Sequence, residues 1–180
     1  KYNGQDSEIS ALLGKCGFMA KPECCAGPYR AGLLKLFGEF ATFGATAEGG
    51  VRRLAASAAD KQARDHLCAW LDRHGFEVVV DPVGNIFGIL ALRGGEGDAY
   101  FFCGSHLDSQ PHGGRYDGTL GVASACYCAL AIRQAVEEGA LLSAYSHIVV
   151  ACWTGEEGAR FQPSILGSST FCGALQTADV

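Results

Sequence analysis

The chain has 180 residues, 48% of them hydrophobic, so it is about the length of one ordinary domain and can bury a sizeable core. Its formal net charge of -5, without any run of Lys or Arg, argues against nucleic acid or an anionic membrane as a partner. We find no apolar run that approaches the roughly 20 residues a membrane-spanning helix needs.

The nine cysteines form no C-x-x-C pair, and several lie within apolar segments, where a thiol behaves as a small hydrophobic group. An odd number argues against a complete disulfide framework and against a zinc ribbon. The expected location is therefore the reducing cytoplasm, although Cys16, Cys24 and Cys25 could pair in an exported protein. The chain opens at Lys1 without a signal-peptide pattern, and we expect it to begin inside a longer sequence.

Residues 1–30 mix glycine, proline and cysteine without a sustained period, which predicts an irregular amino-terminal arm. Hydrophobic residues recur at helical spacing over 31–43 and predict a helix with one apolar face. A second helix is predicted from Ser57, a residue suited to the N-cap, to Gly75.

The remainder of the chain predicts four strands and one further helix. In chain order these are the strands 76–81, 86–92 and 99–103, the helix 118–139 and the strand 146–152. A short turn between the first two strands indicates a hairpin, and a helix between the last two indicates a parallel crossover. We therefore expect an α/β fold with a mixed, largely parallel sheet flanked by helices.

The loop 104–118, which follows the third strand, carries side chains that suit a metal ion. His106 offers a neutral imidazole and Asp117 offers two carboxylate oxygens. The H-x-D spacing predicts that Asp108 orients the imidazole of His106. The loop should lie at the carboxyl edge of the sheet, where open α/β folds keep their chemistry. The alternative is a glycine-rich connection with solvated polar residues.

A second acidic loop follows the fourth strand, in the same topological place. Its adjacent residues Glu156 and Glu157 would raise each other's pKa unless a positive charge holds them. A bound cation would remove that conflict, so that one glutamate binds the metal while the other acts as a general base for hydrolysis of an amide-like bond. The alternative is an exposed loop paired with Arg160, as perturbed acids also occur in structural ion networks.

Several sequence blocks in order resemble the amidase branch of the dinuclear-zinc exopeptidase superfamily. That branch holds N-carbamoyl-L-amino acid hydrolases, β-ureidopropionases and allantoate amidohydrolases. The blocks that carry the resemblance are 44–46, 49–54, 81–87, 104–118, 153–161 and 167–168. The resemblance implies that 31–180 is the amino-terminal part of a zinc-exopeptidase-like catalytic domain, with the lid and dimerisation domain absent.

The resemblance also implies roles for the two loops. His106 would bind one metal ion, Asp117 would bridge two, and Glu157 would bind the second. Glu156 would be the general base, and Asp108 would be the acid behind His106. Two divalent ions are implied, and zinc, manganese, cobalt and nickel all suit such a mixed histidine and carboxylate site.

The implied function is hydrolysis of a linear amide or ureido C–N bond. The implied partner is a small molecule, an N-carbamoyl-L-amino acid, a β-ureido acid or allantoate, and a full-length parent would be a homodimer. Tyr116 beside Asp117 fits the amidase branch better than an aminoacylase or dipeptidase, which stays an alternative. Further histidine ligands of relatives lie beyond the region matched, so an inactive truncated remnant or a binding module with a degenerate metal site is a second alternative.

Overall fold

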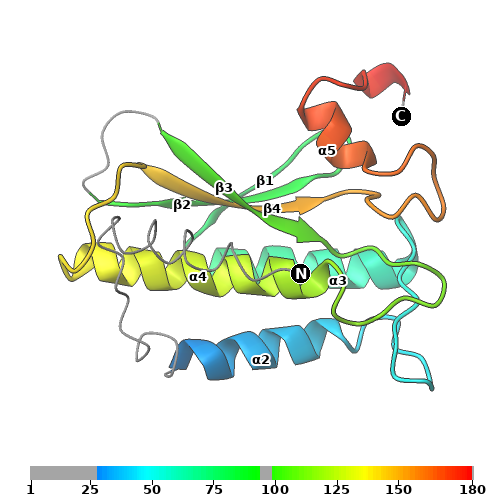
Figure 1. Ribbon diagram of the computed structural model, residues 1–180, viewed down its shortest axis with the longest axis horizontal. Coiled ribbons are helices and arrows are strands. Elements are labelled where there is room, and N and C mark those ends of the chain that lie inside the picture. Colours follow the sequence, from blue (N-terminus) through cyan, green and yellow to red (C-terminus); the bar gives the residue numbers. More distant parts are fainter. Residues whose placement is uncertain (1–27, 94–98, 180) are drawn as a thin grey trace, which may run out of the picture. The chain divides into compact units, whose positions relative to one another are not determined.

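The computed structural model describes residues 28–93 and 99–179. Most of the arm predicted over 1–30, with Cys16, Cys24 and Cys25, lies outside the described residues. The chain divides into two compact units, Lys1–Ala31 and Gly32–Val180, and the site lies in the second. Figure 1 shows the elements, which are α2 (Pro28–Phe40), α3 (Ala58–Arg73), β1 (Glu77–Val80), β2 (Ile86–Ala91), β3 (Tyr100–His106), α4 (Thr119–Glu137), β4 (His147–Trp153), α5 (Leu166–Phe171) and the 3₁₀ helix η2 (Thr177–Asp179).

The four described strands form one mixed sheet in the order β1-β2-β4-β3. The predicted hairpin is confirmed, because β1 and β2 pair antiparallel. The predicted crossover is confirmed as well, because β3 and β4 pair parallel and are joined through α4. The expectation of a largely parallel sheet was wrong for these strands, since β2 also pairs antiparallel with β4.

One face of the sheet is covered by α3 and α4 (Figure 1). Helix α3 packs on β1 and β2, and α4 packs on β3 and β4. The layers approach closely, because a Cβ added at Gly88 would lie 2.6 Å from Leu71 and one added at Gly121 would lie 2.7 Å from Ser105. Both glycines therefore serve the packing of helix on strand. On α3, Leu67, Trp70 and Leu71 are buried.

Helix α4 corrects the expectation that no segment is apolar enough to span a membrane. It is 19 residues long, and a stretch of 18 residues within it has a mean hydropathy of 1.3, so it could do so by length and composition. The same helix packs on β3 and β4 and buries Val122, Cys126 and Ala129 among others. A helix that packs on a sheet can be equally long and apolar, so length and apolarity alone do not indicate a membrane span.

Arg53 is buried and ties three segments together near the site. Its Nε donates to the carbonyl of Leu107 at 2.5 Å, and Nη1 donates to those of Phe40 and Phe43 at 2.8 Å each. Its Nη2 donates to Thr119 Oγ1 at 2.8 Å. Burial is the main cause that lowers the pKa of this guanidinium. The side chain thus fixes the end of α2, the loop after β3 and the start of α4 relative to one another.

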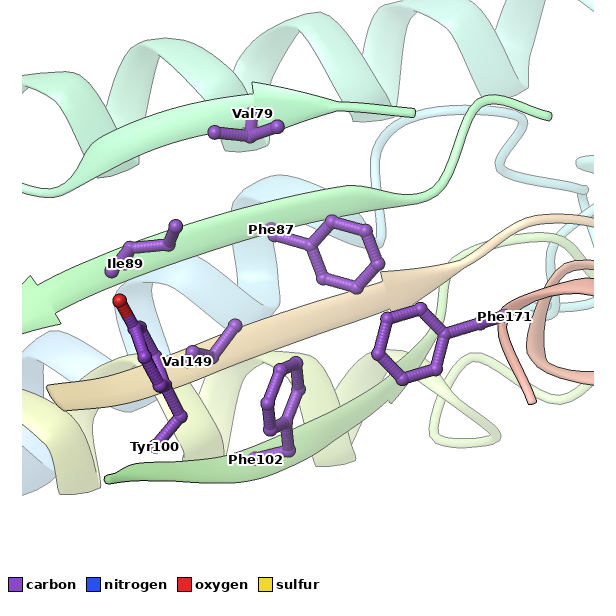
Figure 2. A pocket seen from close by; sticks show the side chains of 7 residues that line it. All are labelled: Val79, Phe87, Ile89, Tyr100, Phe102, Val149 and Phe171. Atoms are coloured by element: carbon purple, nitrogen blue, oxygen red, sulfur yellow. The ribbon is translucent and has the colours of Figure 1, made fainter. Parts of the chain in front are cut away.

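The opposite face of the sheet is apolar, and among the described elements only α5 lies against it (Figure 1). A shallow pocket of about 250 Å³ lies on this face, and Figure 2 shows the side chains that line it. Its lining comes from all four strands and α5, and consists of Val79, Phe87, Ile89, Tyr100, Phe102, Val149 and Phe171. Phe102 and Phe171 expose 44% and 49% of their surface, so part of an apolar layer is left in contact with solvent.

Candidate active site

The two polar loops meet at one edge of the sheet. Because β3 and β4 run parallel, their carboxyl ends lie side by side, and His106 stands opposite Trp153 in the register. His106 is the last residue of β3, and Glu156 follows β4 by three residues. This arrangement confirms that both loops emerge at the carboxyl edge of adjacent strands.

The ring of His106 is buried, with Nδ1 facing Asp108 and Nε2 facing Asp117 and Glu156. Its Nδ1 lies 2.9 Å from the backbone oxygen of Asp108 and 3.6 Å from Oδ1 of the same residue. Since a carbonyl oxygen can only accept, Nδ1 carries a proton, and in the neutral ring Nε2 presents its lone pair. Nε2 lies 3.4 Å from Oε2 of Glu156 and 3.7 Å from Oδ1 of Asp117.

Asp108 joins the two loops through one buried carboxylate. Its Oδ1 accepts a hydrogen bond from the backbone N–H of Glu156, and its Oδ2 accepts one from that of Glu157, both at 3.2 Å. The same residue orients His106 through its backbone oxygen. The sequence predicted that Asp108, as an acid, orients His106; the use of its backbone oxygen and the anchoring of the second loop are additional findings.

Burial, hydrogen bonds and nearby charges shift the pKa values of His106 and Asp108. Burial of the His106 ring lowers its pKa, but the hydrogen bonds and charge of Asp108, together with the charge of Glu156, outweigh burial and raise the pKa overall. For the carboxyl of Asp108 burial acts in the opposite direction and raises the pKa. The hydrogen bonds from His106 and from the backbone of Glu157 and Glu156 outweigh burial and lower the pKa overall. The pair therefore favours an ionised carboxylate beside the imidazole.

Glu157 is placed differently from Glu156. Its Oε2 accepts a hydrogen bond from Nε2 of Gln110 at 2.8 Å, and its backbone oxygen accepts a second from the same nitrogen at 3.1 Å. Gln110 thus links the first loop to the second, a contact that the sequence analysis did not anticipate. The structure brings His106, Asp117 and Glu156 together and leaves the carboxylate of Glu157 with Gln110.

The donors around Nε2 of His106 fit a divalent cation. Two ligands held about 2.0–2.2 Å from a tetrahedral ion lie about 3.3–3.6 Å apart. The separations of 3.4 and 3.7 Å from Nε2 to the two carboxylates are close to that spacing. Within the described part of the chain, no group of three or more His, Cys, Asp or Glu side chains closes around a single point. These residues therefore fit a metal ion as an open, partial ligand set.

Comparison with known proteins gives a consistent family. The model of peptidase family M28 matches residues 85–179. A Mycolicibacterium smegmatis protein named as a hydrolase is 45% identical over 142 residues, which cover 79% of this chain and 32% of that protein. The N-carbamoyl-L-amino-acid amidohydrolase of Rhizobium meliloti is 39% identical over 136 residues, which cover 75% of this chain and 31% of that enzyme.

A solved structure has the same fold as well as a related sequence. The hydantoinase/carbamoylase family amidase from Burkholderia ambifaria superposes with a TM-score of 0.73 at 40% sequence identity. The match covers 83% of this chain and 35% of that structure. The chain thus spans about a third of the length of the relatives it matches.

Proposed function

The chain belongs to peptidase family M28, and on this premise we propose that the protein is a metal-dependent hydrolase of linear amide or ureido C–N bonds. The observation that carries the proposal is the meeting of two loops at one sheet edge, where Nε2 of His106 faces Asp117 and Glu156 at 3.7 and 3.4 Å. Asp108 holds both loops in that position. A buried imidazole among carboxylates is a site suited to a metal and a base.

The substrate class that we propose is the N-carbamoyl-L-amino acids, with β-ureido acids and allantoate as alternatives. The support is the 39% identity to an N-carbamoyl-L-amino-acid amidohydrolase. We further propose that 31–180 forms the amino-terminal part of a larger catalytic domain, since the relatives are about three times as long. A homodimer is proposed for that larger protein, on the family resemblance alone.

A cytoplasmic location is proposed on the state of the thiols. Cys103 and Cys152 are free, and burial raises their pKa values to about 11 and about 12. Thiols of this kind are inert packing groups, which suit a reducing compartment. The net charge of -5 supports a small-molecule partner over nucleic acid.

The proposed roles follow the geometry of the site. His106 and Asp117 would hold one divalent ion, Asp117 would be shared with a second, and Glu157 would reach the second after leaving its bond to Gln110. When bound, the ions would lower the pKa of a water molecule and polarise the scissile carbonyl. Glu156 would accept the proton of that water and transfer it to the leaving nitrogen. The carboxylate of Asp108 would keep the base in reach.

The test combines metal content with hydrolysis of an N-carbamoyl amino acid in the presence of manganese or zinc. Replacement Glu156→Gln should lower kcat by about 10²–10⁴-fold while bound metal is retained, because a general base contributes that much. Replacement Asp117→Ala should lose metal. The matched control is Glu48→Gln, an exposed glutamate, which should change neither.

Two results would contradict the proposal in different ways. Turnover by Glu156→Gln at the wild-type rate would remove Glu156 from the role of base. Absence of both metal and turnover in the wild type would favour a binding module with a degenerate site, in keeping with the open ligand set seen among the described residues.

A further inference from the structure

Asn85 links three segments that are distant in sequence. The side chain is fully buried just before β2, with none of its surface exposed. Its Nδ2 donates to Oδ2 of Asp81 at 2.8 Å and to the backbone oxygen of Gly167 at 3.0 Å. Its Oδ1 accepts from the backbone N–H of Thr154 at 2.9 Å. Both N–H groups and the oxygen of this amide are therefore used.

The segment that Asn85 holds is the one that carries Glu156. The carbonyl groups of 154–156 accept hydrogen bonds from the N–H groups of 165–167, at 2.8 to 3.2 Å, in the pairs Gly167 to Thr154, Leu166 to Gly155 and Ile165 to Glu156. On the other side, Asp108 accepts from the N–H groups of Glu156 and Glu157. The acidic loop is thus held from two sides. On the first side, Asn85 bonds to both segments, to Thr154 and to Gly167.

The fit around Asn85 is tight and chemically selective. A Cβ added at Gly167 would lie 2.1 Å from Oδ1 of Asn85 and 2.6 Å from the N of Thr154, so a glycine is needed there. The hydroxyl of Thr154 is buried without a hydrogen-bond partner among the described residues, so the backbone N–H and carbonyl are the groups that anchor this residue. Asp81 Oδ1 accepts from the N–H of Asn85 at 2.8 Å and fixes the amide from behind. The site requires a short side chain with two N–H donors and one acceptor, which asparagine supplies and serine, threonine and aspartate do not.

We propose that Asn85 is a positioning residue for Glu156. It acts through Thr154 and Gly167, whose backbone it holds, and so sets the point from which the Glu156 carboxylate faces His106. The catalytic part of this inference rests on the proposed function, but the positioning itself is a property of the metal-free chain. Misplacement of a reacting group by about 1 Å can cost about 10²-fold in rate.

The experiment compares Asn85→Ala with Leu90→Ala in the metal-free full chain by amide hydrogen exchange. Leu90 is a buried residue of β2, the strand that follows Asn85, so its replacement by alanine is a matched core destabilisation. Asn85→Ala should speed the exchange of the backbone amide hydrogens of 154–157 and 165–167 at least tenfold relative to those of strands β1 to β4. Leu90→Ala should leave that ratio unchanged. In turnover assays Asn85→Ala should lower kcat at least tenfold with little change in KM.

The two hypotheses fail separately. Unchanged relative exchange of 154–157 in folded Asn85→Ala would overturn the positioning role, whatever the activity. A wild-type chain that does not hydrolyse the substrate would overturn the proposed function and leave the exchange result to decide on Asn85. If the alanine variant does not fold, Asn85→Asp keeps the acceptor for Thr154 and loses the donors to Gly167 and Asp81. It should then speed exchange at 165–167 more than at Thr154, and equal exchange at both places would contradict the proposal.

Discussion

Asp108 holds the ring of His106 through its backbone oxygen and the second loop through its carboxylate. The pKa of His106 is raised above its ordinary 6.5 and that of Asp108 is lowered below its ordinary 3.8. A raised histidine pKa stabilises the fold at pH values below 6.5, and this stabilisation is lost as the pH rises through the folded value. A lowered aspartate pKa stabilises it above 3.8, and is lost as the pH falls through the folded value. The pair therefore contributes most between about pH 4 and 6.5.

The first residue-scale prediction follows from that window. In the metal-free protein, Asp108→Asn should lower the pKa of the His106 ring, because burial then acts without the compensating charge. It should also reduce stability more at pH 5.5 than at pH 8. Histidine resonances and urea unfolding at the two pH values measure both effects. The exposed Asp72→Asn serves as control, and an equal loss of stability at both pH values would refute the assignment.

A second residue-scale prediction concerns Arg53, which satisfies three carbonyl groups and one hydroxyl from inside the protein. Replacement Arg53→Met keeps an unbranched apolar stem but removes the four hydrogen bonds that Arg53 donates, and among the described residues only the carbonyl of Phe40 retains another donor, the N–H of Phe43. Each buried unpaired group costs about 1–3 kcal/mol, so we expect a loss of about 3–5 kcal/mol in the free energy of unfolding. Urea unfolding measures it. The neighbouring Arg52→Met is an exposed control that should change stability by about 0.5 kcal/mol or less.

At the scale of the elements, the long helices and most strands could be predicted, because hydrophobic periodicity, N-cap residues and turn residues lie within or beside each element in the sequence. Ser57 caps α3 as expected, with its hydroxyl accepting from the N–H of Asp60. Strand β3 was expected to end at Cys103 but continues to His106, since residues 104–106 pair with β4 although they are polar or glycine. Such pairing depends on a neighbour strand and leaves no hydrophobic pattern in the sequence.

Helix α5 was not predicted for a related reason. Its six residues include one leucine and one phenylalanine, too few for a period, and it starts after Ile165 in a left-handed conformation. The backbone contacts with 154–156 hold it instead. The position of Glu157 was equally hidden, because adjacent residues of a loop take opposite sides only once the loop has folded. The meeting of His106 with Asp117 and Glu156, in contrast, follows from parallel strands and was predictable.

At the scale of the whole molecule, the sheet face that the described elements cover only in part and the edge strand β3 determine how the chain should behave in solution. Exposed apolar patches and unpaired edges favour self-association. We expect the chain to associate as its concentration rises, and Phe102→Lys to weaken this at least several-fold. Light scattering over a concentration series measures it. The control Leu142→Lys changes a leucine that is 94% exposed and lies outside the pocket lining, and an equal effect of both variants would contradict a role for the face.

The two faces of the sheet can be followed separately by fluorescence, because the sequence has two tryptophans and one lies on each side of the sheet. Trp70 of α3 is buried in the helical layer and stacks on the ring of His74 at 3.8 Å. Trp153 ends β4 on the open face, 5.3 Å from the ring of Phe171, and directly precedes the acidic loop. Single-tryptophan variants would therefore emit from one layer each. Fluorescence of Trp153 would follow coverage of the open face or occupancy of the neighbouring loop, while that of Trp70 would follow unfolding of the helices.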